Sequence, residues 1–182
     1  HRVQVFQLPK IDQTITYGEL PEVKLKDGFF KLEALASSGL PVVFTSSNTD
    51  VATIEGVTVT LRKVGTINIT ANQGGNDIFN PALPVVRELK IIKDEQSITF
   101  HELSEVKLKD GSFFLEAVSS SGLPVTFSSS DTDIATIDGK AVTLKKTGTI
   151  NITANQAGND EFNPAIAVVR ELVIARADQV IN

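Results

Sequence analysis

The sequence predicts an all-β chain of two tandem β-sandwich domains with about seven strands each. One observation is an internal repeat: the run QTITYGELPEVKLKDG, which starts at Gln13, returns 83 residues later, at Gln96, as QSITFHELSEVKLKDG. The correspondence continues to the end of the chain without an insertion or deletion, and about two thirds of the aligned positions are identical. The other observation is that short stretches of alternating apolar and polar residues are separated by turn signals, with no helical periodicity.

The first half of a unit contains expected strands near residues 14–17, 23–26, 30–34 and 42–44. Asp27-Gly28 supplies a tight turn with positive φ, and Ser37–Gly39 turns the chain again. Pro41 stands at the start of a strand, where its missing N–H does least harm. The side chains expected to face inward are Ile15, Tyr17, Val23, Leu25, Phe30, Leu32, Ala34, Val42 and Phe44.

The second half of a unit contains expected strands near residues 51–54, 57–61, 66–72 and 85–91. Glu55-Gly56 closes the turn between the first two of these strands, and Gly65 precedes the third. A long loop from Gln73 to Pro84 leads to the last strand, where the alternation slips phase around 85–88 and predicts a β-bulge. The expected inward residues are Val57, Val59, Leu61, Ile67, Ile69, Ala71, Leu89 and Ile91.

The second copy preserves the inward positions, and its substitutions fall mainly on outward positions or conserve size. One aromatic residue changes place, because Phe29 and Lys31 become Ser112 and Phe114. Phe29 and Phe114 are therefore predicted to be partly exposed, unless a loop covers them. The inward set of the second copy is Ile98, Phe100, Val106, Leu108, Phe113, Leu115, Ala117, Val125, Phe127, Ile137, Val142, Leu144, Ile150, Ile152, Leu172 and Ile174.

The composition excludes several classes of function. A net charge of −5 and a pI near 5.1 disfavour binding to nucleic acid and to anionic membranes, both of which need a basic face. No apolar run approaches the roughly 20 residues that span a bilayer, so membrane insertion is not expected. The absence of cysteine rules out disulfides, thiolate metal sites and thiol catalysis. A lack of cysteine is common in bacterial surface proteins.

The residues of both copies are similar to a known family. The segments SSGLPVVFTSSNTDVATIEG, VTVTL and GTINITANQGGNDIFNPA, and their counterparts in the second copy, resemble the bacterial immunoglobulin-like (Big) repeats of the group 2 type. The resemblance implies immunoglobulin-like β-sandwiches strung together in large secreted or surface-anchored bacterial proteins. Such proteins include adhesins of the intimin and invasin kind and multidomain extracellular enzymes. The family has no universal binding residues, so none is carried over.

The repeat sets the expected domain boundaries at 13–95 and 96–178. Residues 1–12 fit the closing strand of a preceding repeat or a linker, and residues 179–182 fit the start of a following repeat. The junction at 92–96 is short and contains neither Gly nor Pro, which predicts a stiff connection. We therefore expect the domains to be arranged end to end and to be partners of neighbouring repeats in the same chain.

No catalytic residue is predicted. The only histidines are His1, at the end of the chain, and His101, which aligns with Gly18. A Ser-His-Asp or Cys-His constellation therefore cannot be built within a unit. Acidic pairs such as Glu33 with Asp50 are more simply explained as solvated surface residues.

A calcium site is the one metal site that the residues suggest, and no other cofactor is expected. Asp77 and Asp160 lie in the long loops, while Asp94, Glu95 and Asp178 lie at the junctions between units. Calcium takes six to eight oxygen ligands, often gathered from loops. No DxDxD-type run is present, however, and Asn-Asp after Gly more often supplies turn chemistry. Turn chemistry is the favoured interpretation and calcium the alternative.

The long loops GNDIFNPA and GNDEFNPA are almost unchanged between the copies. Phe79 and Phe162 are expected to plug the end of the sandwich, while Pro81 and Pro164 fix the direction in which the loop leaves. A ligand-binding role for these loops is the alternative, since loops on rigid scaffolds often carry function.

These observations favour a non-catalytic spacer or stalk in a large bacterial surface-anchored or secreted, adhesin-like protein, located outside the cell. The alternative is an adhesive module that contacts a host receptor, a polysaccharide or a neighbouring cell. A further alternative is an accessory segment of an extracellular hydrolase. The partners expected beyond the chain itself are a cell-surface or polysaccharide ligand.

Overall fold

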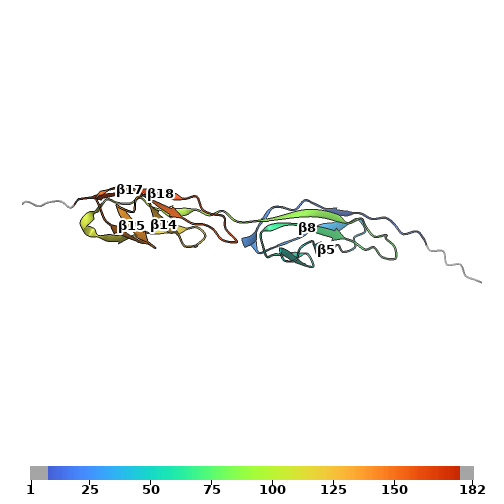
Figure 1. Cartoon of the computed structure of the whole chain (residues 1–182). Helices are drawn as coiled ribbons and strands as arrows, with labels where there is room; N and C mark the ends of the chain where they lie inside the picture. Colours follow the sequence, from blue (N-terminus) through green and yellow to red (C-terminus); the bar gives the residue numbers. More distant parts are fainter. Residues whose placement is uncertain (1–7, 177–182) are drawn as a thin grey trace, which may run out of the picture. The chain divides into compact units, whose positions relative to one another are not determined.

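The computed structural model of the protein describes residues 8–176. The chain divides between Asp94 and Glu95 into two compact units, each of which is a β-sandwich (Figure 1). We call residues 8–94 unit 1 and residues 95–176 unit 2. Most of the predicted closing strand at 1–12 and the predicted start of a third repeat at 179–182 lie outside the described residues.

Unit 1 consists of short strands and one single-turn 3-10 helix. In chain order these are β1 (Ile15–Tyr17), β2 (Val23–Lys24), η1 (Leu25–Asp27), β3 (Phe29–Lys31), β4 (Ala34–Ala36), β5 (Val43–Ser46), β6 (Ala52–Glu55), β7 (Thr58–Leu61), β8 (Gly65–Asn72) and β9 (Val85–Ile92).

The strands of unit 1 form two layers. One layer has the order β2-β9-β8-β5, in which β2 runs parallel to β9 and the other pairs are antiparallel. The other layer contains β3-β7-β6 and the pair β1-β4, because β4 follows β3 after two residues. β1 with β2, and β3 with β4, each count as one interrupted strand, which gives the seven strands of an immunoglobulin-like sandwich. The all-β, two-sandwich prediction is confirmed.

Unit 2 repeats this layout with the same strand order. Its elements are β10 (Ile98–Phe100), β11 (Val106–Lys107), η2 (Leu108–Asp110), β12 (Ser112–Phe114), β13 (Ala117–Ser119), β14 (Thr126–Ser129), β15 (Ala135–Asp138), β16 (Ala141–Leu144), β17 (Gly148–Asn155) and β18 (Val168–Ala175).

A hydrophobic core lies between the two layers of each unit. The long paired strands contribute several of the fully buried side chains, among them Ile69 and Leu89 in unit 1 and Ile152 and Leu172 in unit 2. Every residue of the predicted inward set of unit 2 is buried or packs against the core. Phe29 and Phe114 are 63% and 78% exposed, as the exchange of an aromatic residue between the copies predicted.

The predicted β-bulge at 85–88 is absent. β9 pairs with β8 without interruption from Ala71–Val85 to Gly65–Ile91. The sequence suggested a shift in the alternation of apolar and polar residues because Arg87 lies at a position whose side chain faces inward, where a hydrophobic residue was expected. Its guanidinium group donates to the backbone oxygen of Tyr17 at 3.1 Å and pairs with Glu19 at the margin of the sandwich.

Three local predictions need correction. Leu25 lies in η1 instead of a strand, because the chain turns at Gly28, where φ is +75°. The strand expected at 30–34 is broken into β3 and β4, which pair with different strands. Val57 is 45% exposed instead of inward, because it precedes β7 in the turn.

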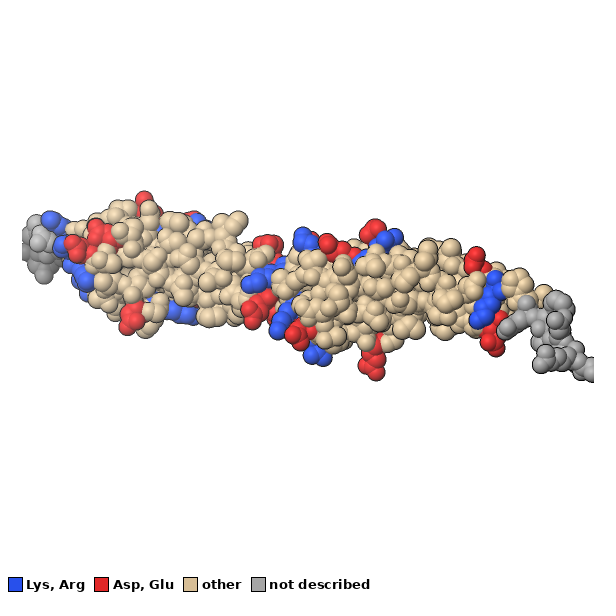
Figure 2. Space-filling model, turned by 45° about the vertical axis from the view of Figure 1, so that its right-hand side comes forward, with Lys and Arg blue, Asp and Glu red and all other residues tan. Residues whose placement is uncertain are grey.

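The charged residues of both units are mixed in sign. Figure 2 shows Lys and Arg side chains interspersed with Asp and Glu over the visible face. Within residues 8–176, no helix is long and apolar enough to cross a membrane.

Candidate functional site

The long loop of unit 1 is held by a buried network of polar side chains. The Gln13 Nε2 group donates to Gln73 Oε1 at 2.8 Å and to the backbone oxygen of Asn80 at 2.7 Å, while Gln13 Oε1 accepts from the Ser38 hydroxyl at 2.5 Å. Gln73 in turn donates to the Pro41 carbonyl and accepts from the Gly75 amide. Both glutamines are more than nine tenths buried. The network ties the first strand, the loop and the start of β5 together.

Unit 2 contains the same network, built from Gln96, Gln156 and Ser121 with the carbonyls of Asn163 and Pro124. Sequence reasoning missed these glutamines as structural anchors. For Gln13 and Gln96 the available signal was that both copies keep glutamine while the residues on either side change; Gln73 and Gln156 end a segment that is identical in both copies and offered no such contrast.

The loops also contain the predicted turn chemistry. Asn76 Oδ1 accepts hydrogen bonds from the backbone amides of Ile78 and Phe79 at 2.8 and 2.9 Å, and Asn159 does the same in unit 2. Gly75 has φ +73°, and a Cβ atom there would collide with the Phe79 carbonyl oxygen. The turn interpretation of the Gly-Asn-Asp segments is therefore confirmed.

The prediction that Phe79 plugs the end of the sandwich is wrong. Phe79 is only half-buried and is not one of the residues packed against the core of unit 1. Its backbone instead forms an isolated parallel bridge with Ile11. The buried glutamines, together with buried Ala82, hold the loop in place.

The calcium candidates in the described part of the chain are of three kinds: exposed loop acids, a buried ion-paired acid and a hydrogen-bonded junction acid. Asp77 and Asp160 are exposed. Asp94 is buried and forms ion pairs with Lys24, at 2.5 Å, and Lys26. Glu95 accepts a hydrogen bond from the side-chain amide of Asn163 at 2.8 Å.

Asp178, the remaining calcium candidate, lies outside the described residues. Between residues 8 and 176, no group of three or more His, Cys, Asp or Glu residues is placed to hold a metal ion. Calcium binding therefore stays an untested alternative to turn chemistry.

Tyr17 is buried in the core of unit 1 and places a hydroxyl group in an apolar setting. Its ring lies 5.4 Å from that of Phe44, and its hydroxyl has no hydrogen-bond partner among the described residues. Burial raises the pKa of Tyr17 to about 12, and the nearby positive charge of Arg87 opposes this shift. Phe100 occupies the equivalent position in unit 2 without this hydroxyl.

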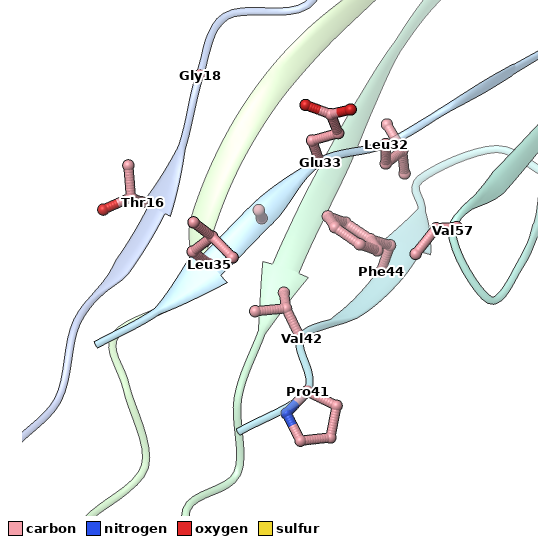
Figure 3. Close-up of a pocket in the computed structure, with 10 residues that line it drawn as sticks. Thr16, Gly18, Leu32, Glu33, Leu35, Pro41, Val42, Phe44 and Val57 are labelled. Carbon is pink, nitrogen blue, oxygen red and sulfur yellow. The ribbon is translucent and has the colours of Figure 1, made fainter. Parts of the chain in front are cut away.

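A hollow with a volume of about 570 Å³ lies on unit 1. It begins on the outer face of β1 and β4, continues past the edge of β4, and ends at the start of β5 (Figure 3). Leu32 and Phe44 form its buried floor, whereas Leu35 and Val57 at its margin are 77% and 45% exposed. Among the described residues that line it, Glu33 is the only ionisable one.

The equivalent hollow of unit 2 is smaller, at about 320 Å³, and more polar. Lys140 stands in place of Val57, and His101 stands in place of Gly18. It is lined from β10 and β13 and does not extend to the start of β14. The two units therefore differ at the place where unit 1 is open and apolar.

Comparisons with known proteins add only distant likenesses. No protein-family model and no curated protein matches the chain. Similar solved structures include Drosophila N-cadherin EC1-4 (13% identity, TM-score 0.37, covering 92% of this chain and 50% of that one). Others are the surface layer protein SbsC, domains 1–6 (16%, 0.37, 93% and 28%), and the D00-D0 domain of intimin (15%, 0.33, 87% and 98%).

The chain thus spans half or less of the length of the N-cadherin and SbsC structures. Identities and TM-scores of this size do not assign a family or a function.

Proposed function

We propose that the two units are a non-catalytic spacer in a bacterial surface-anchored or secreted protein, of the immunoglobulin-like repeat type that their sequence resembles. One observation carries this proposal: strand register and the buried glutamine network recur at an offset of 83 residues, from Gln13 to Gln96 and from Gln73 to Gln156. Two units whose strand pairing and buried hydrogen bonds agree this closely are suited to serve as interchangeable links. The absence of cysteine, which many bacterial surface proteins share, supports an extracellular location.

The strand layout of unit 1 also suits a mechanical role. The incoming chain is held beside the long loop, where Ile11 bonds to Ile78 and Asn80. The chain leaves the unit at the end of β9, whose last residues pair in parallel with Val23 and Lys24. Pulling the two ends apart would load this parallel pair in shear, so that its hydrogen bonds have to break together. Unit 2 has the same pair between β11 and β18.

Single-molecule stretching of this chain tests the proposal. Two separate unfolding events are expected, each lengthening the chain by roughly 250 Å, which is the extended length of one repeat less its folded span. A single event for both units, or gradual extension without a force peak, would contradict a role as independent load-bearing links.

A second candidate function is an adhesive module, and the apolar hollow of unit 1 is the observation that favours it. A glycan array and a cell-binding assay on this chain separate the two functions. Reproducible submicromolar binding to a glycan or to cells would show that the chain is more than a spacer.

A further inference from the structure

We propose that unit 1 binds an extended peptide segment of a partner protein along the free side of β4. The segment would carry apolar side chains and one Lys or Arg, and it would lie in the hollow that separates β4 from the start of β5. This binding site goes beyond the spacer role and belongs to unit 1 alone.

The backbone provides the first argument. β7 pairs with β3, and the last bond of this ladder runs from the Leu32 amide to the Val57 carbonyl at 2.8 Å. β4 continues past this point with β1 on one side and, among the described strands, none on the other. β5 is likewise the last strand of its sheet. A one-sided strand presents backbone groups that an added strand can pair with.

The side chains around this edge provide the second argument. Leu35 points away from the core at the margin of the hollow, and Val57 lies at its other margin (Figure 3). Leu32, Val42 and Phe44 line its deeper part. Because alternate side chains of a strand point to opposite faces, an added strand would place its apolar side chains over the deeper part of the hollow and the side chains between them beside Glu33 and Leu35. About five residues, at roughly 3.3 Å each, would span the stretch from Leu32 to Ala36.

Charge specifies the peptide further. Glu33 is exposed beside the hollow and forms no ion pair within the described part of the chain. A basic residue of the peptide would supply the missing partner. In unit 2, Lys140 lines the same hollow as Glu116, the counterpart of Glu33, although the two side chains form no ion pair within the described part of the chain. A lysine there replaces the apolar Val57 of unit 1, which makes the hollow of unit 2 less suited to an apolar peptide.

A peptide fits this site better than a sugar does. Sugar-binding sites commonly offer exposed aromatic faces, but the aromatic side chain in this hollow, Phe44, is 7% exposed. The exposed groups are aliphatic side chains next to an open strand edge, which favour strand addition.

NMR titration of the ¹⁵N-labelled chain tests the proposal. The probe is a blocked heptapeptide of alternating valine and threonine with a central lysine. Saturable shifts are expected at the amides of 32–36 and 42–44, with a Kd of about 0.1–1 mM because the contact is short. The counterparts in unit 2, at 115–119 and 125–127, are expected to stay unchanged.

Matched variants assign the binding to these features. Val57→Lys, which copies unit 2, is expected to weaken binding more than tenfold. Glu33→Gln is expected to weaken it about two- to fivefold, as for an exposed ion pair. Lys140→Val is expected to create weak binding in unit 2. Val57 is exposed and unit 2 carries lysine there, so Val57→Lys tests binding without disturbing the core; unchanged amide shifts elsewhere verify its fold.

Three outcomes would overturn the proposal. One is that no saturable shift occurs in unit 1 at several millimolar peptide, and another is that Val57→Lys binds as well as the parent chain. The third is that a peptide with central glutamate binds equally well, which would indicate nonspecific apolar contact. If a soluble glycan shifts these amides and the peptide does not, the site is a sugar site. The Val57→Lys variant should keep its two unfolding events, so this test is independent of the spacer role.

Discussion

Replacing Gln13 with alanine should destabilise unit 1 and leave unit 2 intact. The Gln13 side chain makes three hydrogen bonds inside the protein, two as donor and one as acceptor. Alanine removes all three and leaves the Asn80 carbonyl and the Ser38 hydroxyl without these partners. Gln73 Oε1 retains the Gly75 amide as a donor.

The size of the effect follows from these contacts. A hydrogen bond contributes about 0.5–1.5 kcal/mol net, and a buried group left unsatisfied costs about 1–3 kcal/mol. Some of the freed groups will reach water, because Ser38 and Asn80 are only part-buried. We therefore expect a loss of about 3 kcal/mol. For a domain of this size, that loss lowers the Tm of unit 1 by roughly 12–24 °C.

Thermal unfolding followed by NMR measures the Tm of each unit, because amides of the two units report separately. Calorimetry measures the same loss as a shift of one of the two transitions. Gln96→Ala is the matched variant, and it should lower the Tm of unit 2 by a similar amount while sparing unit 1. Ser38→Ala removes one of the three bonds to Gln13 and should cost about 1 kcal/mol. A Gln13→Ala loss below about 0.5 kcal/mol would refute the network as the anchor of the loop.

Further predictions concern Tyr17, Gly75 and calcium. Tyr17→Phe should stabilise unit 1 by up to about 1 kcal/mol, since it removes a buried hydroxyl without a partner. Between pH 10 and 12 the folded state keeps the Tyr17 proton that the unfolded state loses. The free energy of unfolding of unit 1, measured by urea titration, should therefore fall across this pH range. It should fall less in the Tyr17→Phe variant. Gly75→Ala should cost about 3 kcal/mol in urea unfolding, against about 1 kcal/mol for Gly28→Ala, whose added Cβ meets nothing within 4 Å. Adding EDTA should leave both Tm values unchanged within about 1 °C; a larger drop would establish a structural ion.

The core of each unit could be predicted from the sequence because burial follows the two-residue period of a strand. Ile67, Ile69 and Ala71 show this, since all three are buried along β8. The predicted bulge failed because hydrophobicity alone marked the inward positions. Arg87 keeps the phase of β9, but its long side chain reaches a backbone oxygen at the margin, where a charged group stays hydrated.

The candidate site could be predicted less well, because its parts come from distant positions in the chain. Gln13 and Gln73 are 60 residues apart and meet only after folding. The hollow of unit 1 depends on where the ladder between β3 and β7 ends, which no local pattern specifies. The two copies nevertheless contained a usable signal, because the exchange of Val57 for Lys140 is visible in the aligned repeat.

The two copies also show which features the fold requires and which it leaves free. On the surface, Glu22 pairs with Lys90 at 2.5 Å in unit 1. In unit 2 the counterpart of Lys90 is Val173, and Glu105 pairs with Lys107 instead. Exposed ion pairs of this kind contribute little, about 0–1 kcal/mol, so their partners can change without loss of the fold.

A buried glutamine with three partners has no such freedom, and both copies keep it. A function confined to one unit must therefore arise from exposed positions that differ between the copies. The lining of the hollow is such a place: His101, Val118 and Lys140 of unit 2 replace Gly18, Leu35 and Val57, and the hollow of unit 2 is smaller and contains a cation. Exchanging Val57 and Lys140 between the units leaves the shared interior unchanged, so it tests what unit 1 does alone apart from what the chain does as a repeated link.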